Sequence, residues 1–352
     1  MEAHGRLQEK GNEAMKKFPL LASAVTGSLL LAACSGGSAD DGASDDGGSG
    51  LQTVDVGHVQ LPIFAPLYVA DAKGYFADEG IEINLETVKS GQDAVPLASS
   101  GQLDVVAAGF SAGMFSAIET GLDVTVVGSM GVSDGNTESS PTDLVVSSTL
   151  VDSGEVGSVA DLEGRKVGAA GGPGGTGAYL LSLALEEEGL TINDVEIVNL
   201  GNPDMPTAIA NGSIDAGLIS APFSTLAIED GTGTSFGVPP EGTSGTGVVY
   251  GGEFASSDLA QPFFDALARA AKDLQGQDRY SEENLEIIGA ATGQTADEVA
   301  AVPLYTWLPD LAPLPEQLAA MERVWMESGA LEYAEPLPEE NYVDATFASN
   351  VE

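Results

Sequence analysis

The chain has very few basic residues. Its 352 residues include 12 Lys and Arg against 54 Asp and Glu, which gives a formal net charge of −42. A surface this acidic repels the phosphates of nucleic acids, so we expect no nucleic-acid partner. The acidic excess fits a saline habitat, where salt screens the self-repulsion of the folded state, and it fits a simple need for solubility equally well.

Cysteine and histidine are also scarce. With one Cys and two His, the chain cannot assemble a disulfide framework or a zinc site of Cys and His side chains. Carboxylate-only calcium sites stay open in so acidic a chain, although we find no calcium loop of the EF-hand pattern. We therefore expect neither a metal site nor a cofactor.

Aromatic and charged residues are sparse, at 6% and 19%, whereas hydrophobic residues make up 43% and glycine is abundant with 45 copies. This composition is typical of a folded, Gly-rich α/β chain rather than a disordered one. The length favours two lobes over one core of ordinary size.

The N-terminus has the pattern of a secretory signal. Met15-Lys16-Lys17 precedes an apolar run over 18–33, and the run is too short for a comfortable membrane span. Its end, Leu31-Ala32-Ala33-Cys34, is similar to the bacterial lipobox, in which the cysteine is acylated and becomes the mature N-terminus. We predict a leader and signal peptide over 1–33, with Met15 as an alternative start, and lipid attachment at Cys34; an ordinary buried cysteine is the alternative.

Residues 34–50 form a segment with almost nothing to bury. After Cys34 the segment consists only of Ser, Gly, Asp and Ala. We predict a flexible acidic tether that holds the folded part away from the membrane, so that the lipid is the only membrane contact. The expected location is the outer face of the cytoplasmic membrane.

Beyond the tether, short β-rich runs alternate with helical segments, which predicts α/β units and a mostly parallel sheet. One series runs over 53–128 and a second over 166–219, with β-rich stretches at 143–147 and 247–251 that would cross between them. Helices at 262–275, 281–289, 295–301 and 315–328 would pack on the first lobe. We thus assign 51–143 and 247–352 to a discontinuous first lobe and 144–246 to a second.

A glycine-rich stretch, GAAGGPGGTGAYLL at 168–181, lies between a predicted strand and a helix. Glycines allow the backbone to approach a ligand closely, and the N–H groups at the helix start favour polar or negative ligand atoms. No Lys-Ser/Thr pair follows, so the stretch is not a phosphate-binding P-loop. A flexible turn without a ligand is the alternative.

Four further stretches carry a family resemblance: PIFAPLYVADAKGYF at 62–76, ASSGQLDV at 98–105, SVADLEGRKV at 158–167 and ANGSIDA at 210–216. In this order, behind a lipobox, they resemble the nitrate/sulfonate/taurine and thiamine-pyrimidine-precursor class of ABC-transporter substrate-binding proteins in lipoprotein form. The resemblance covers nearly all of the chain beyond Leu51. It implies a periplasmic-binding-protein-like fold of type II, in which two α/β lobes joined by two crossing strands close on a ligand. It also implies a monomer whose partners are a small-molecule ligand and an ABC permease with its ATPase.

By position, the resemblance implies a set of residues that line the ligand cleft: Gln60, Phe64, Ser90, Gln92, Phe110, Ser111, Gly174, Gly175, Thr176, Ser220 and Phe223. For the three phenylalanines core packing is the alternative, and for Ser111, Thr176 and Ser220 it is helix capping. The sequence departs from the family before Pro222-Phe223, where an acidic residue or Trp is common and Ser220-Ala221 stands here. No Arg is placed to clamp an anion, so a neutral or heteroaromatic ligand fits as well as a sulfonate.

An enzyme on the same fold is the rival reading, because a relative of this family makes the thiamine pyrimidine. His58 is the only histidine beyond the leader, and its place within the first strand favours a structural role. No paired carboxylates or activated nucleophile are evident, so we expect no catalytic residues. A ligand sensor that does not import its ligand stays open.

Overall fold

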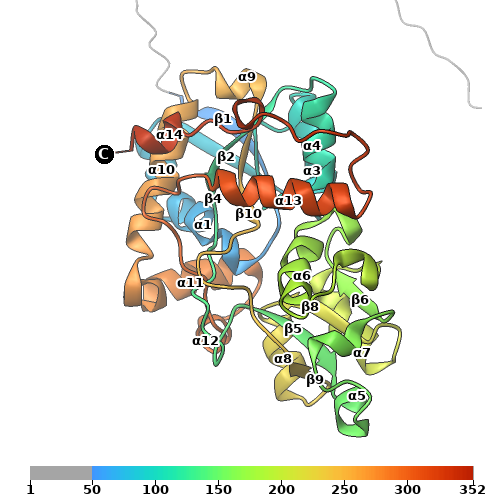
Figure 1. The fold of residues 1–352 in the computed structure, drawn as a ribbon. Helices are drawn as coiled ribbons and strands as arrows, with labels where there is room; N and C mark the ends of the chain where they lie inside the picture. The colour runs from blue at the N-terminus through green and yellow to red at the C-terminus, as the bar shows by residue number, and fades with distance from the viewer. Residues whose placement is uncertain (1–49, 352) are drawn as a thin grey trace, which may run out of the picture. The chain divides into compact units, whose positions relative to one another are not determined.

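Two five-stranded mixed sheets, each covered by helices, form the described part of the chain (Figure 1). The structure is a computed structural model and describes residues 50–351, which belong to one compact unit. The predicted signal peptide, Cys34 and the tether up to residue 49 lie outside the described residues.

The first sheet has the strand order β2-β1-β3-β10-β4. Its strands are β1 (Gln52–His58), β2 (Ile81–Thr87), β3 (Val105–Gly109), β4 (Val124–Ser129) and β10 (Thr246–Gly251). β1 runs parallel to β2 and β3, whereas β10 is antiparallel to β3 and β4.

The second sheet repeats this plan with the order β7-β6-β8-β5-β9. Its strands are β5 (Thr142–Ser147), β6 (Lys166–Ala169), β7 (Glu196–Asn199), β8 (Ala216–Ser220) and β9 (Gly233–Ser235). β6 is parallel to β7 and β8, and β5 is antiparallel to β8 and β9.

The chain crosses between the sheets twice, over 130–141 and over 236–245. The strand after each crossing, β5 or β10, is the antiparallel one of its sheet because the chain arrives from the other lobe. This explains why the sheets are mixed where the sequence predicted mostly parallel ones. The predicted fold of two α/β lobes with two crossings is confirmed, while the predicted lobe bounds stay a prediction; β5 belongs to the second sheet from Thr142 on.

Helices pack on both sheets at nearly the bounds that the hydrophobic pattern predicts. Along the first sheet and its C-terminal extension lie α1 (Ala65–Ala72), α2 (Tyr75–Asp78), α3 (Gly91–Ser99), α4 (Ala112–Glu119), α9 (Gly252–Ala255), α10 (Ala260–Asp273), α11 (Glu282–Thr292), α12 (Ala296–Ala300) and α14 (Thr346–Ser349). With the second sheet lie α5 (Ser148–Ser153), α6 (Thr176–Glu187), α7 (Met205–Ala210) and α8 (Phe223–Glu229). Short 3-10 helices are η1 (Pro62–Phe64), η2 (Val159–Leu162), η3 (Gly172–Gly174), η4 (Ile192–Asp194), η5 (Asn202–Asp204), η6 (Gly276–Tyr280) and η7 (Glu339–Asn341). Within residues 50–351, no helix has the length and apolar character needed to cross a membrane.

Helix α13 (Pro315–Glu327) differs from the expectation that every C-terminal helix packs on the first lobe. It lies against α4 of the first lobe and α6 of the second (Figure 1). Trp325 is fully buried there, meets the ring of Phe115 edge-on at 5.7 Å, and donates its indole N–H to the carbonyl oxygen of Gly175 at 3.2 Å. Helix α13 therefore packs on both lobes.

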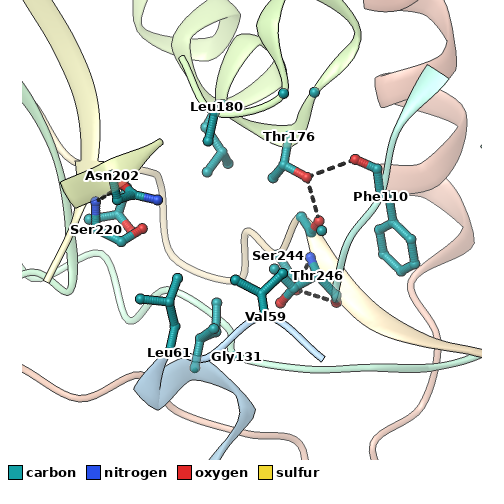
Figure 2. Close-up of a pocket in the computed structure, with 18 of the residues that line it drawn as sticks. Val59, Leu61, Phe110, Gly131, Thr176, Leu180, Asn202, Ser220, Ser244 and Thr246 are labelled. Atoms are coloured by element: carbon teal, nitrogen blue, oxygen red, sulfur yellow. Dashed lines mark hydrogen bonds between the residues drawn. The ribbon is translucent and has the colours of Figure 1, made fainter. Parts of the chain in front are cut away.

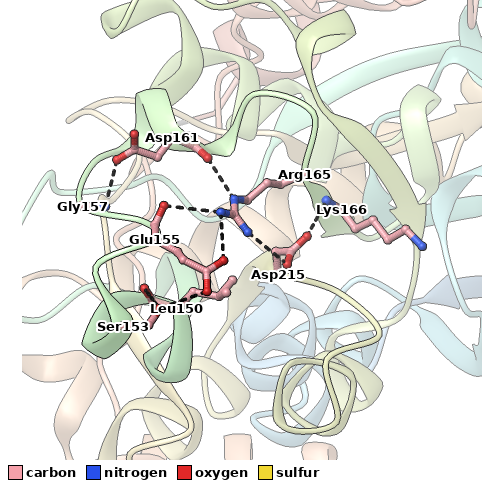
Figure 3. A network of polar contacts seen from close by, with 8 residues as sticks. All are labelled: Leu150, Ser153, Glu155, Gly157, Asp161, Arg165, Lys166 and Asp215. Atoms are coloured by element: carbon pink, nitrogen blue, oxygen red, sulfur yellow. Dashed lines mark hydrogen bonds and ion pairs between the residues drawn. The ribbon is translucent and has the colours of Figure 1, made fainter.

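Arg165 fixes the start of the second lobe (Figure 3). Its guanidinium lies 3.6 Å from the carboxylates of Glu155 and Asp215, and Asp215 also accepts the backbone N–H of Lys166 at 2.9 Å. These contacts join the loop before β6 to the turn before β8. Arg165 is thus committed to a structural network at the surface.

Candidate functional site

A cavity of about 130 Å³ lies between the two sheets (Figure 2). Its walls come from the segments that follow β1, β2, β3, β6 and β8, from both crossings, and from Tyr305 in the loop after α12. Small-molecule sites of open α/β sheets typically lie at these carboxyl ends of the parallel strands. The volume is about ten times what one water molecule needs, which suits a ligand of roughly ten non-hydrogen atoms.

The structure brings most of the predicted site residues together around this cavity. The lining includes Phe64, Ser90, Gln92, Phe110, Ser111, Gly175, Thr176 and Ser220. Their contact with a ligand stays a prediction.

Three predicted residues lie elsewhere. Gln60 donates its side-chain N–H to the carbonyl of Ala291 at 2.7 Å and, like Phe223 at the start of α8, lines two neighbouring pockets rather than the cavity. Gly174 packs on the other side of its loop, where an added Cβ would lie 2.9 Å from the Cβ of Ala112. The glycine there allows close packing rather than ligand approach.

Two aromatic lining residues serve mainly the core. Phe64 is 1% exposed and Phe110 is 6% exposed. The ring of Phe110 points away from the interior in Figure 2 and lies on Gly247, where an added Cβ would be 2.4 Å from its Cζ. This favours packing over stacking on a ligand for Phe110.

Hydroxyl groups predicted for the ligand are already engaged. Ser90 and Ser111 cap α3 and α4, accepting the backbone N–H of Asp93 and Met114, both at 3.3 Å. Thr176 Oγ1 lies 2.9 Å from the carbonyl oxygens of Phe110 and of Gly245, between which it shares its one hydrogen. Thr176 thereby joins α6 of the second lobe to the end of β3 and to the second crossing.

The sequence did not single out Asn202, Thr246 or Tyr305, which also line the cavity. Asn202 Oδ1 accepts the backbone N–H of Ser220 at 2.8 Å. The Tyr305 hydroxyl contacts Thr142 Oγ1 and donates to the carbonyl of Pro141 at 3.3 Å, and burial raises its pKa. Asn202 follows a strand, the place where polar site residues gather, but Tyr305 comes from a loop without any pattern.

Comparison with known proteins identifies the family. The profile of the family described as NMT1/THI5 like matches residues 62–275, which is more than half of the chain. The chain belongs to this family. The resemblance seen in the sequence is thereby confirmed.

One curated relative is an enzyme. It is 4-amino-5-hydroxymethyl-2-methylpyrimidine phosphate synthase from Aspergillus parasiticus, which is 31% identical over 159 residues. The match covers 45% of this chain and 42% of that protein, so it spans less than half of the relative.

Two solved structures similar to this NMT1/THI5-like chain are named as solute-binding proteins. The alkanesulfonate-binding protein SsuA from Xanthomonas axonopodis pv. citri, bound to MOPS, is 18% identical, with a TM-score of 0.61 over 80% of this chain and 94% of that one. The periplasmic nitrate-binding protein NrtA from Synechocystis is 14% identical, with a TM-score of 0.64 over 86% of each chain. At these identities the likeness shows the periplasmic-binding-protein fold.

His58 lies behind the wall of the cavity rather than in it. It is 5% exposed, and its Nδ1 lies 3.1 Å from the hydroxyl of Tyr68, which donates to the carbonyl of Val59 at 3.2 Å. Burial lowers the pKa of His58, so the imidazole is held neutral as part of the core.

Proposed function

We propose that this NMT1/THI5-like protein is an extracytoplasmic solute-binding lipoprotein that captures a small organic or oxyanion nutrient between its lobes and delivers it to an ABC importer. The observation that carries the proposal is the cavity at the facing carboxyl ends of two sheets, lined by residues from both lobes. Rotation of lobes about the two crossings would open it and let the solute in.

The contacts across the cavity support closure around a ligand. Thr176 reaches from α6 to Phe110, and Tyr305 reaches from the first lobe to Pro141 and Thr142 at the start of β5. A ligand that touches both walls would add its own contacts to these, so binding and closure would stabilise one another. A transporter can then distinguish the loaded receptor from the empty one by shape.

The proposal includes a lipid anchor at Cys34 and an ABC permease with its ATPase as partners of a monomer. It rests on the sequence pattern of the leader and on the transport proteins that share the fold. Metabolic labelling with an alkyne fatty acid tests the anchor: wild type should be labelled and Cys34→Ser should not. Labelling of both proteins would place the lipid elsewhere.

A thermal-shift screen of the purified protein tests ligand capture. The panel contains sulfonates, nitrate, pyrimidines and thiamine precursors, and a solute that binds only the folded state raises Tm by linkage. The variant Leu180→Trp fills the cavity from α6, whereas Leu122→Trp adds the same ring at a position 43% exposed, outside the cavity lining. We expect a hit that Leu122→Trp retains and Leu180→Trp loses. A hit that both variants retain would place the ligand outside the cavity.

The related synthase makes catalysis the second candidate. A reaction would need a nucleophile or a titrating group at the substrate. The described residues that line the cavity include hydroxyl groups, Lys89 and Tyr305, but no His, Cys, Asp or Glu that could activate them, and no cluster of such residues suited to a metal occurs within 50–351. Binding without chemistry is therefore favoured. If incubation of the protein with a stoichiometric amount of the solute yields a chemically altered solute, catalysis is favoured instead.

Uptake distinguishes an importer component from a sensor. Cells that lack this protein should lose high-affinity uptake of the solute found in the screen, and the wild-type gene should restore it. Unchanged uptake together with an altered transcriptional response to the solute would favour the sensor.

A further inference from the structure

The cavity offers no charged side chain in its interior. Among the described residues that line it, Lys89 is the one with a charge, and it lies exposed in the segment between β2 and α3. Although the chain has 54 acidic residues, none of them lines the cavity, so the charge of a cationic ligand would have no counter-charge there.

Two carboxylates next to lining residues in the chain are engaged with other partners, while Asp204, two positions after Asn202, is exposed and lines a neighbouring pocket. Asp143, next to the lining residue Thr142, accepts the Ser235 hydroxyl at 2.8 Å, and Asp93 accepts the Ser90 hydroxyl at 2.9 Å. Arg165 is committed to Glu155 and Asp215 (Figure 3). An anion would thus enter against a net charge of −42 and meet no buried cation, which disfavours it as well.

The orientation of the Asn202 amide is fixed by its neighbour. Ser220 donates its backbone N–H to one end of this amide at 2.8 Å, so that end must be the oxygen and the other end must be the NH₂ group. Figure 2 shows this nitrogen on the interior side of Asn202. No described residue accepts a hydrogen bond from it, so the donor is left for a ligand.

Thr246 offers no second polar point to a ligand. Its Oγ1 is buried out of reach of solvent and makes no hydrogen bond with the described residues, and its backbone N–H is held by Ser244 at 3.4 Å. The aliphatic side chains of Val59, Leu61 and Leu180 line the cavity (Figure 2).

We infer that the ligand is an uncharged, largely apolar molecule of roughly ten non-hydrogen atoms that presents a hydrogen-bond acceptor to Asn202 Nδ2. Asn202 is thereby the residue that selects for an acceptor. This inference rests on the proposed function and narrows its ligand class.

Three probes of nearly the same size and shape separate the charge states: neutral benzamide, anionic benzoate and cationic benzamidine. We expect benzamide to bind wild type at millimolar concentration, seen by ligand-observed NMR, at least about tenfold more tightly than the two charged probes, since a buried charge without a partner is costly.

The decisive variant is Asn202→Asp. It keeps an oxygen for the N–H of Ser220 but replaces the interior donor by a charged acceptor. Benzamide should bind at least about tenfold more weakly and benzamidine correspondingly more tightly. Asn199→Asp is the matched control, because Asn199 is exposed and lines a neighbouring pocket but not the cavity; this variant should bind the probes as wild type does.

The outcomes separate this inference from the proposed function. If benzoate binds most tightly and Lys89→Ala loses that binding, the inference is overturned in favour of an anionic ligand. If Asn202→Asp keeps the probe preference of wild type, the role of Asn202 is overturned. Failure of all three probes would overturn the assigned ligand class. The proposed function, capture of a solute, is tested separately by the thermal-shift screen and by uptake. None of the probe results above would overturn that function.

Discussion

Thr176 Oγ1 lies 2.9 Å from the carbonyl oxygen of Phe110, and through this contact the first turn of α6 is bound to the end of β3 in the other lobe. The same hydroxyl reaches Gly245 at 2.9 Å. A side chain at the glycine-rich turn thus holds the two lobes together at the edge of the cavity. From the sequence, Thr176 is expected to contact the ligand, with helix capping as the alternative.

Removing this hydroxyl should loosen the closed arrangement. Thr176→Val keeps the shape and loses the donor, whereas Thr176→Ser keeps the donor and loses the methyl group. Since one hydrogen bond contributes a net ~1 kcal/mol, ligand affinity should fall about three- to tenfold in the valine variant and less in the serine variant. Isothermal titration measures both. Equal affinities for wild type and Thr176→Val would show that the hydroxyl does not support closure.

Gly245 tests the same contact from the other side. A Cβ at this position would lie 2.1 Å from Thr176 Cγ2, so Gly245→Ala should destabilise the fold by about 1–3 kcal/mol in urea unfolding. The double variant Gly245→Ala/Thr176→Ser removes the clashing methyl group and should recover most of that loss. If the serine gives no rescue, the crowding does not arise from Thr176.

The two tryptophans of the chain report on different parts of the molecule. Trp325 packs beside Gly175 at the junction of the lobes, whereas Trp307 donates its indole N–H to Ile63 within the first lobe at 2.9 Å. Ligand-induced closure should change intrinsic fluorescence mainly through Trp325. The change should persist in Trp307→Phe and vanish in Trp325→Phe; the opposite pattern would place the rearrangement inside the first lobe.

His58 makes stability depend on pH. Burial holds its pKa below that of the unfolded chain, about 6.5, so as pH falls through about 6.5 the unfolded state takes up a proton that the folded state refuses. Stability is therefore complete above this value and declines below it. As the pH is lowered from about 7.5 to about 5.5, the melting temperature of wild type should fall, and that of His58→Gln should fall less. Parallel curves would assign the decline to other groups.

Salt should stabilise the folded protein. With a net charge of −42, the compact state repels itself, and the Debye length shrinks from about 10 Å at 0.1 M to about 3 Å at 1 M salt. Melting temperature should rise with NaCl, and KCl of equal ionic strength should give the same rise. A flat curve would contradict a role for self-repulsion and leave solubility as the reason for the acidic surface.

The strands and the longer helices were predictable because their apolar periodicity reflects burial directly, as in β1, α1 and α10. The site was predictable only in outline. Segments after strands were expected to converge, and Ser111 and Gly175 do so. Which atoms face inward depends on tertiary contacts. Thr176 finds a carbonyl partner in the other lobe, and Asn202 is oriented by Ser220, 18 positions away in the chain. Tyr305 comes from an irregular loop whose path the pattern does not determine.

Calorimetric titration of the purified protein with the strongest solute of the screen, for wild type and for Leu180→Trp, is the most direct test of a ligand site between the lobes. We predict one site per chain in wild type and no measurable heat of binding in Leu180→Trp, with Leu122→Trp behaving as wild type. Undiminished binding by a folded Leu180→Trp would contradict a ligand site in this cavity.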